Sequence, residues 1–424
     1  MNAVTSRLRL RTPSPALIRA QAQIVPVEGR TVRRRIGWIW GLLFLNVMPY
    51  SAKSSLIPFP TSLGKVITQG ALAVAFLLAL SINRKVLIRP NLFLLLMTIL
   101  CATSAMMTVR GYFSFLGSDF RIVRLITMVA VLWLLTPWWG RRDMLFLQFQ
   151  RRALFVVLLI VLAGLVVTPG AAFAQAGGGR LGGAIWPIPP TQVAHYAAVL
   201  AGTTIVLWFA DLAKLRTMIA ITALSMGVLV LTHTRTALVA FLIATLVAGI
   251  SLFFSRERVR RAFAITLVVA ALVTLSFAPV IGSWLSRGQS GEQITALTGR
   301  TQTWSALLAQ PRTEVNTLFG YGMSNASFNG LPIDSSWLST YLEQGLVGDV
   351  IEGAVVLTLL LVACFSPRGP RRAVALFLVV YCLIASFTET GLGDASPYLL
   401  DLTVAMSVLM TPATSTRQSE LSTA

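Results

Sequence analysis

The sequence predicts an all-α polytopic membrane protein with about 12 transmembrane helices and a large extracytoplasmic loop carrying short amphipathic helices. Three observations support this class. Hydrophobic residues make up 55% of the 424 positions and charged residues 12%, with a mean hydropathy of +0.76, whereas a soluble domain carries roughly 25% charged residues. Apolar blocks of about 16 to 22 residues recur along the chain, which is the length of a membrane-spanning helix. Basic residues gather in alternate connections between these blocks.

The apolar blocks divide the chain into five parts. Residues 1–35 form a disordered basic tail, 36–281 hold nine helices, 282–345 form the large loop, 346–411 hold three helices, and 412–424 form a second tail. The expected helices lie at approximately 36–51, 66–83, 91–108, 122–139, 153–173, 191–210, 217–232, 236–254, 262–281, 346–365, 373–388 and 396–411. The large loop is long enough for two short helices on the membrane surface, and one of them would place Leu297, Trp304, Leu307 and Leu308 on a single face.

The distribution of charge predicts the orientation of the chain. Most of the 35 Lys and Arg residues fall in the two tails and in one alternating set of connections. Such an excess marks cytoplasmic loops, so both termini are expected in the cytoplasm and the protein in the cytoplasmic (inner) membrane of a bacterium, with no cleavable signal peptide. The net charge of +20 then reflects orientation and contact with anionic lipid, not binding of nucleic acid.

Few residues have the spacing of a cofactor or metal site. The cytoplasmic connections are short and contain no P-loop or dinucleotide fingerprint, which argues against an ATP-driven pump. The only histidines, His195 and His233, lack metal-ligand spacing with cysteines or carboxylates. His195 is expected to be buried and hydrogen-bonded. We therefore expect chemistry that needs neither a metal nor a cofactor.

Five arginines are expected near the extracytoplasmic face. They are Arg121, Arg124, Arg180, Arg235 and Arg300. A guanidinium group forks two hydrogen bonds onto phosphate oxygens and keeps its charge at physiological pH. Several converging guanidinium groups would form a pyrophosphate site. The alternative is contact with lipid head groups, because interfacial arginines reach lipid phosphate routinely.

Carboxylates on the same side have two interpretations. Asp334 could act as a general base toward a sugar hydroxyl, or it could cap the helix that follows it. Glu343 and Glu352 fall within apolar sequence, where an acid is costly, and could pair with an arginine inside the bundle. Glu389 and Asp394 in the last connection could simply be solvated.

Several segments between residues 175 and 365 resemble the bacterial O-antigen ligase and O-antigen polymerase-like superfamily. An arginine-glycine loop, an arginine turn, two glycine elements of the large loop and its closing helix match in order. They are Arg180-Leu-Gly-Gly, Thr232-His-Thr-Arg-Thr-Ala, Gly299-Arg300 with Trp304, Phe319-Gly-Tyr-Gly and Leu338 through Gly348. The resemblance implies a polytopic enzyme acting on polyprenyl-diphosphate-linked glycans at the outer face of the cytoplasmic membrane.

One departure from the family pattern favours a polymerase over a ligase. Ligases carry His-Asn four residues before the leucine of the closing helix, where this chain has Asp334-Ser335. The resemblance assigns catalytic roles to Asp334, Arg180 and Arg235. Arg300, His233, Trp304 and Tyr321, in or beside the resembling segments, are expected to bind substrate. Arg121 and Arg124 lie outside those segments and are expected to bind substrate from their place near the extracytoplasmic face.

The expected function is metal-independent glycosyl transfer that polymerises surface polysaccharide or exopolysaccharide repeat units. The expected partners are a polyprenyl-diphosphate-linked oligosaccharide, a glycan acceptor and membrane lipid, with further proteins of an envelope polysaccharide assembly complex possible. Three alternatives stay open. They are a ligase that transfers the glycan to another acceptor, a secondary transporter or flippase coupled through Glu343 or Glu352, and a non-catalytic scaffold.

Overall fold

The computed structural model describes residues 30–49, 61–110, 118–174, 179–253, 257–262, 264–265, 276, 300–323 and 327–411. These residues are mostly helical. The helices are α2 (Arg30–Val47), α3 (Thr61–Ile82), α4 (Leu92–Arg110), α5 (Ser118–Leu135), α6 (Leu145–Val167), α7 (Pro169–Ala174), α8 (Pro190–Phe209), α9 (Leu215–Leu231), α10 (Arg235–Phe253), α13 (Arg300–Ala309), α14 (Glu314–Phe319), α15 (Ser336–Phe365), α16 (Pro370–Ala385) and α17 (Pro397–Leu409). A 3-10 turn (Thr136–Trp138) follows α5, and β1 (Ser327–Phe328) pairs antiparallel with β2 (Leu331–Pro332).

Seven helices of the described residues are long and apolar enough to cross a membrane. They are α3, α4, α5, α6, α8, α10 and α15, while α9 and α17 are apolar but shorter. The predicted helical membrane-protein class is therefore confirmed at this level. Every predicted span except 262–281 overlaps a helix, and 262–281 lies almost wholly outside the described residues. A total of twelve spans stays a prediction.

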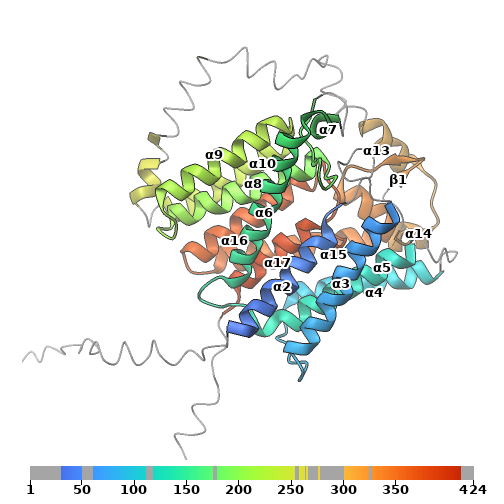
Figure 1. Ribbon diagram of the computed structural model, residues 1–424. Helices are drawn as coiled ribbons and strands as arrows, with labels where there is room; N and C mark the ends of the chain where they lie inside the picture. Colours follow the sequence, from blue (N-terminus) through green and yellow to red (C-terminus); the bar gives the residue numbers. More distant parts are fainter. Residues whose placement is uncertain are drawn as a thin grey trace, which may run out of the picture.

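The helices pack in two groups joined by α15 and α6. One group contains α2, α3, α4 and α5, and the other contains α8, α9, α10, α16 and α17. α15 contacts α4 of the first group and α16 of the second. In Figure 1 the short elements α7, α13, α14 and β1 lie along one edge of the bundle, at its upper right. This edge carries most of the polar side chains described below.

Proline and serine residues fix where several helices begin. Pro190, Pro370 and Pro397 occupy first-turn positions of α8, α16 and α17, where the missing N–H has no intrahelical partner to lose. Ser396 caps α17 by accepting a hydrogen bond from the Leu399 amide at 3.2 Å. Of these helices, α8 and α17 begin at the edge where the preceding connections carry Arg180 and Glu389, whereas α16 begins at the opposite end of the bundle.

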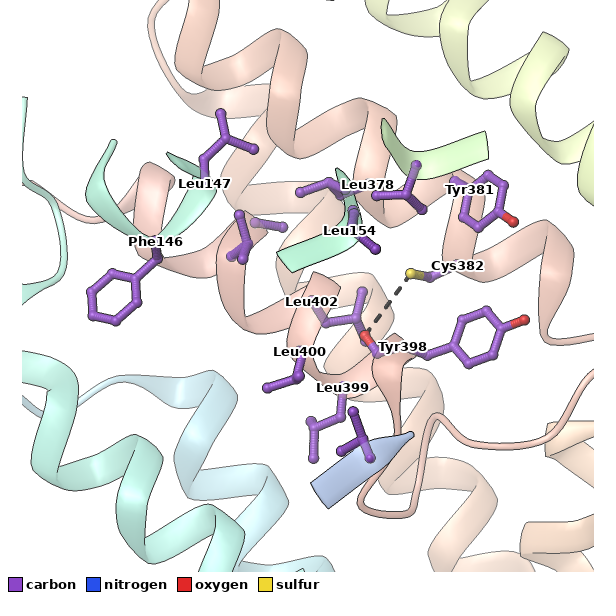
Figure 2. Packing of buried hydrophobic residues seen from close by; sticks show 14 of the residues in the cluster. Phe146, Leu147, Leu154, Leu378, Tyr381, Cys382, Tyr398, Leu399, Leu400 and Leu402 are labelled. Atoms are coloured by element: carbon purple, nitrogen blue, oxygen red, sulfur yellow. Dashed lines mark hydrogen bonds between the residues drawn. The ribbon is translucent and has the colours of Figure 1, made fainter. Parts of the chain in front are cut away.

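The core runs through both groups of helices, and one part of it lies between α6, α8, α16 and α17. Leu154 of α6, Leu378 of α16 and Leu402 of α17 are fully buried against one another (Figure 2). α8 is buried over most of its length and is rich in alanine. In a bilayer the lipid is as apolar as these side chains, so close van der Waals packing of small residues, not removal of water, holds such helices together.

The largest difference from the predicted boundaries concerns α15. The predicted span begins at residue 346, whereas α15 starts at Ser336 and runs for 30 residues. The helix is interrupted at Gly345, whose φ of 67° is a left-handed conformation. The end of the predicted large loop is thus the first segment of a broken helix, and the predicted boundary coincides with the break.

Gly320, which follows α14, lies against this break. The interruption leaves the carbonyl groups of Leu342 and Glu343 without helical partners, and the amides of Tyr321 and Gly322 donate to them at 3.0 and 2.9 Å. A Cβ atom on Gly345 would lie 2.5 Å from the Gly320 nitrogen. The Phe319–Gly322 segment and the Leu338–Gly348 helix therefore require glycine at both positions, because their backbones touch.

Candidate functional site

Arg180 is held at the edge of the bundle by the turn that precedes α10. Its Nε donates to the carbonyl oxygen of Thr232 at 3.0 Å, and its Nη2 donates to the hydroxyl of Thr234 at 3.1 Å. The connection that carries it is anchored by the amide of Leu181, which donates to the carbonyl of Leu231. The predicted arginine loop and arginine turn are therefore in direct contact, although about fifty residues separate them.

Arg300, the first residue of α13, is paired with Asp334. The Nε of Arg300 lies 3.0 Å from Oδ2 of Asp334, and the two side chains are 28% and 40% exposed. The N-cap of α15 is Ser335, whose side chain makes no capping bond. The alternative that Asp334 caps this helix is therefore wrong, because its carboxylate is directed to an arginine.

Glu389 joins these residues from the connection between α16 and α17. The turn that carries it is fixed to the start of α15: the Ser336 amide donates to the Ser386 carbonyl at 2.8 Å, and the Trp337 indole donates to the Ser386 hydroxyl at 3.0 Å. Glu389 interacts electrostatically with Arg300, Asp334 and Arg180 and accepts a hydrogen bond from Thr191. The expectation that Glu389 is merely solvated is wrong, since the side chain is only partly exposed and is surrounded by charges.

We call Arg180, Arg300, Asp334 and Glu389 the Arg180 cluster. Its members come from four separate segments of the chain. Burial raises the pKa of Glu389 to about 7, with Asp334 adding to the rise and the two arginines opposing it. Burial also lowers the pKa of Arg180, as does the charge of Arg300, while Glu389 acts in the opposite sense. The cluster therefore combines two guanidinium groups with one carboxylate held in an ion pair and one that exchanges a proton near neutral pH.

Arg235 and His233 border the cluster through the turn that binds Arg180. Arg235 begins α10 directly after Thr234 and is partly buried. His233 has a left-handed φ of 50° at the centre of the turn. Both predicted residues are thus next to the hydroxyl that receives the Arg180 hydrogen bond.

The two predicted aromatic residues lie farther along the same edge of the bundle. Trp304 stands one turn after Arg300 on α13 and is partly buried. Tyr321 is 40% exposed, and the guanidinium carbon of Arg312 lies 5.5 Å from its ring centroid and 4.1 Å from that of Tyr341. Of the expected amphipathic face, Leu307 is buried and Leu308 is exposed, while Leu297 lies outside the described residues.

Arg121 and Arg124 form a separate, internal network. Arg121 bridges two carboxylates, Glu343 Oε1 at 2.6 Å and Asp394 Oδ2 at 2.7 Å. Arg124 donates to the Asn46 side chain and backbone and to the Ala395 carbonyl. The structure therefore does not bring these two arginines into the Arg180 cluster, and both are engaged by protein groups.

The structure bears out one of the three expectations for the acids Glu343, Glu352 and Asp394. Glu343 pairs with an arginine as predicted. Glu352 does not: its two oxygens accept from Ser336 at 2.7 Å and Thr340 at 2.5 Å. Asp394 is not simply solvated. Burial alone would raise the pKa of Asp394, but the charges of Arg121 and Arg124, with hydrogen bonds from Arg121 and the Ala395 amide, hold it below the usual range.

His195 is buried, as predicted, and lies beside a carboxylate, but its ring nitrogens make no hydrogen bond of good geometry among the described residues, contrary to expectation. Its Nε2 is 3.1 Å from Oδ2 of Asp401 on α17, and both side chains are almost fully buried. Gln150 of α6 donates to the other oxygen of Asp401 at 2.8 Å and accepts from Trp40 of α2 at 2.9 Å. This polar chain crosses four helices of the core. Its members therefore specify how those helices register against one another.

The fold and these contacts define a helical membrane-type protein with an arginine- and carboxylate-lined site at one edge of its bundle. Within the described ranges, no three His, Cys, Asp or Glu side chains come together as a metal-binding group would require. Neither the protein-family models nor the curated proteins searched contain a match to this chain.

Proposed function

We propose that the protein is a metal-independent glycosyltransferase that polymerises polyprenyl-diphosphate-linked repeat units at the outer face of the bacterial cytoplasmic membrane. The observation that carries the proposal is the Arg180 cluster. Two guanidinium groups and two carboxylates of different proton affinity, drawn from four segments, lie at one edge of a bundle of membrane-type helices. Phosphate binding and hydroxyl activation need these two kinds of group side by side.

Arg180 and Arg300 bind the diphosphate of the donor, with Arg235 as a further ligand. Arg180 is already oriented by Thr232 and Thr234, and Arg300 by Asp334. Guanidinium groups held in place before the reaction stabilise negative charge as it develops on the leaving diphosphate, usually the largest contribution to catalysis in such sites. His233, Trp304 and Tyr321 border the path of the sugar.

The acceptor hydroxyl attacks the anomeric carbon of the donor sugar. The new oxygen–carbon bond forms as the bond from the anomeric carbon to the diphosphate oxygen breaks, and the electron pair leaves with the diphosphate. A carboxylate takes the hydroxyl proton. Glu389 is better suited to this role than Asp334, because Asp334 is tied to Arg300 whereas the pKa of Glu389 lies at about 7. Asp334 then orients Arg300 and the acceptor.

A deletion strain tests the proposed function in cells. Loss of a polymerase leaves lipid-linked single repeat units, which extraction and mass spectrometry of polyprenyl-linked oligosaccharides would detect. Accumulation of completed lipid-linked chains would instead identify a ligase. No change in lipid-linked glycans would reject both activities and favour the scaffold or transporter alternatives.

A further inference from the structure

We propose that a groove between α2 and α6 binds an anionic phospholipid, with the phosphate head group at a cluster of arginines and an acyl chain along the apolar remainder. The groove encloses about 870 Å³. Its arginines are Arg30, Arg33, Arg34 and Arg152, and its other lining residues are apolar side chains and glycines. We call it the α2–α6 groove.

The lining residues follow one face of each helix. On α2, Arg30, Arg34, Trp38, Gly41 and Leu45 recur at helical spacing. On α6 the corresponding face carries Phe149, Arg152, Val156 and their neighbours. At 1.5 Å per residue, the 18 residues of α2 extend about 27 Å, close to the thickness of the hydrocarbon core of a bilayer. A groove that combines arginines near the start of α2 with apolar side chains beyond them has the polarity profile of a lipid.

The charge at the head-group end is largely uncompensated. Arg33 is engaged by Asp143 at 3.2 Å and by Gln148 at 2.8 Å. Among the described residues, Arg30, Arg34 and Arg152 have no carboxylate partner, and all three are exposed. Arg30 and Arg34 belong to the first turns of α2, and Arg152 lies one turn beyond Phe149 on α6. These positive charges would attract an anion into the groove.

Gly41 leaves the floor of the groove open. A Cβ atom on Gly41 would meet no other atom within 4 Å. A Cβ atom on Gly37, one turn earlier, would lie 2.9 Å from the Phe149 ring, so this ring occupies the space beside Gly37 and leaves the space beside Gly41 open. Trp38 is 59% exposed beside this opening and can cover an inserted chain.

The charge of the groove favours a lipid as its occupant over the chain segment that precedes α2. The preceding residues 1–29 contain four arginines and a single acid, Glu28. A segment of the same sign as the groove cannot neutralise it, whereas a phosphate head group does. The occupant we propose is therefore an anionic phospholipid of the membrane.

The α2–α6 groove is independent of the proposed glycosyl transfer. The indole of Trp186 donates to the Pro49 carbonyl at 3.1 Å, which places the far end of α2 next to the connection that carries Arg180. The arginines at the start of α2 are thus at the opposite end of that helix from the Arg180 cluster.

Native mass spectrometry of the delipidated, detergent-solubilised full chain tests the proposal. The protein is titrated with dioleoylphosphatidylglycerol or dioleoylphosphatidylcholine, and bound lipid is counted. We expect the wild type to bind phosphatidylglycerol at least tenfold more tightly than phosphatidylcholine. The double variant Arg34→Gln/Arg152→Gln should lose about thirtyfold in phosphatidylglycerol affinity, or about fivefold per arginine, from an attraction of about 1 kcal/mol per basic residue. Gly41→Leu fills the groove and should prevent binding of either lipid.

Two matched variants serve as controls. Gly70 on α3 is also an exposed helical glycine with no atom within 4 Å of an added Cβ, so Gly70→Leu should leave lipid binding unchanged. Arg84→Gln removes an exposed charge outside the groove and should also have no effect. Equal binding of the two lipids by the wild type, or wild-type phosphatidylglycerol binding by Gly41→Leu, would overturn the proposal. The proposal would also be overturned if millimolar inorganic phosphate displaced bound phosphatidylglycerol as well as added phosphatidylglycerol does. That result would indicate a site for free anions.

Discussion

The Nε of Arg300 lies 3.0 Å from Oδ2 of Asp334, across 34 residues of sequence. This ion pair joins the first residue of α13 to the residue before the N-cap of α15. It fixes the direction of the Arg300 guanidinium and brings it next to Glu389 and Arg180. The geometry of the Arg180 cluster therefore depends on Asp334, whichever group accepts the proton.

Replacement of Arg180 should abolish activity without removing the protein. We expect Arg180→Ala to lower the rate of polymer formation by about 10² to 10³, the usual effect of losing one preorganised donor. Arg180→Lys should retain part of the rate, since it keeps the charge but loses the forked geometry. Arg216→Ala, an exposed charge at the start of α9, is the control and should be neutral. Polymer yield and protein level by immunoblot are the measurements.

Asp334 and Arg300 should show coupled effects on rate. Asp334→Asn and Arg300→Gln each release the same ion pair, so the double variant should be little slower than the slower single variant. Their coupling in thermal stability should stay below about 1 kcal/mol, because the pair is partly exposed. Additive losses in rate would mean that the two residues act separately.

Glu389 should control the pH dependence of the reaction. Its carboxylate must be ionised to accept a proton, and its pKa is about 7. The rate should therefore rise as pH increases through about 7 and level off above it. Glu389→Gln should lose most of the rate and show no titration near pH 7. If the pH–rate profile of Glu389→Gln kept the midpoint of the wild-type profile, the titration would belong to another group.

The same residue should affect stability in a defined pH window. Burial raises the pKa of Glu389 from 4.5 to about 7, so the folded state holds a proton that the unfolded chain releases between these values. The stabilisation is fully present below pH 4.5 and is lost as pH rises through about 7. Melting temperatures of the wild type should fall across this window relative to Glu389→Gln, and parallel curves would refute the assignment.

The Arg121 network should matter for stability instead of catalysis. Arg121→Met leaves Glu343 and Asp394 buried without their shared partner, which should cost about 3 to 5 kcal/mol. Adding Glu343→Gln and Asp394→Asn to Arg121→Met should recover most of the lost stability, because these changes remove the unpaired charges. Arg110→Met, at the exposed end of α4, is the matched control. Thermal unfolding in detergent would measure all three.

The contact between Gly320 and Gly345 predicts a strong positional effect of alanine. Gly345→Ala would place a Cβ atom 2.5 Å from backbone atoms of Leu318 and Gly320, at a φ of 67° that alanine disfavours. We expect loss of folded protein. Gly353→Ala on the same helix meets only Trp337, at 3.8 Å, and should be tolerated. Equal yields of the two variants would contradict the close backbone contact.

Hydropathy predicted the helices well because their signal is local. Each of α4, α8 and α10 is a run of apolar residues whose length matches a span. The start of α15 was predicted too late, since Ser336, Thr340 and Glu343 read as loop residues although their polar groups are satisfied within the bundle. Hydropathy does not encode such pairings.

The site was predicted in part for a similar reason. Arg180, Arg300 and Asp334 were expected at one face, and the structure brings them together. Glu389 was missed because its neighbours are remote in sequence. The one local signal was a pair of carboxylates, Glu389 and Asp394, in a short connection between apolar helices. Arg121 and Arg124 differ from the other arginines in lying one turn apart at the start of a predicted span, but only the fold shows that they form a separate network with protein groups.

Reconstitution of the purified protein in liposomes would decide whether it extends lipid-linked glycans. The substrate is a polyprenyl-diphosphate-linked single repeat unit, supplied with a chelator and without nucleotide sugar. We predict glycans of two or more repeats on the lipid, release of polyprenyl diphosphate, and neither product with Arg180→Ala. Movement of the unmodified repeat unit across the membrane without elongation, or elongation that Arg180→Ala leaves intact, would contradict the proposed reaction.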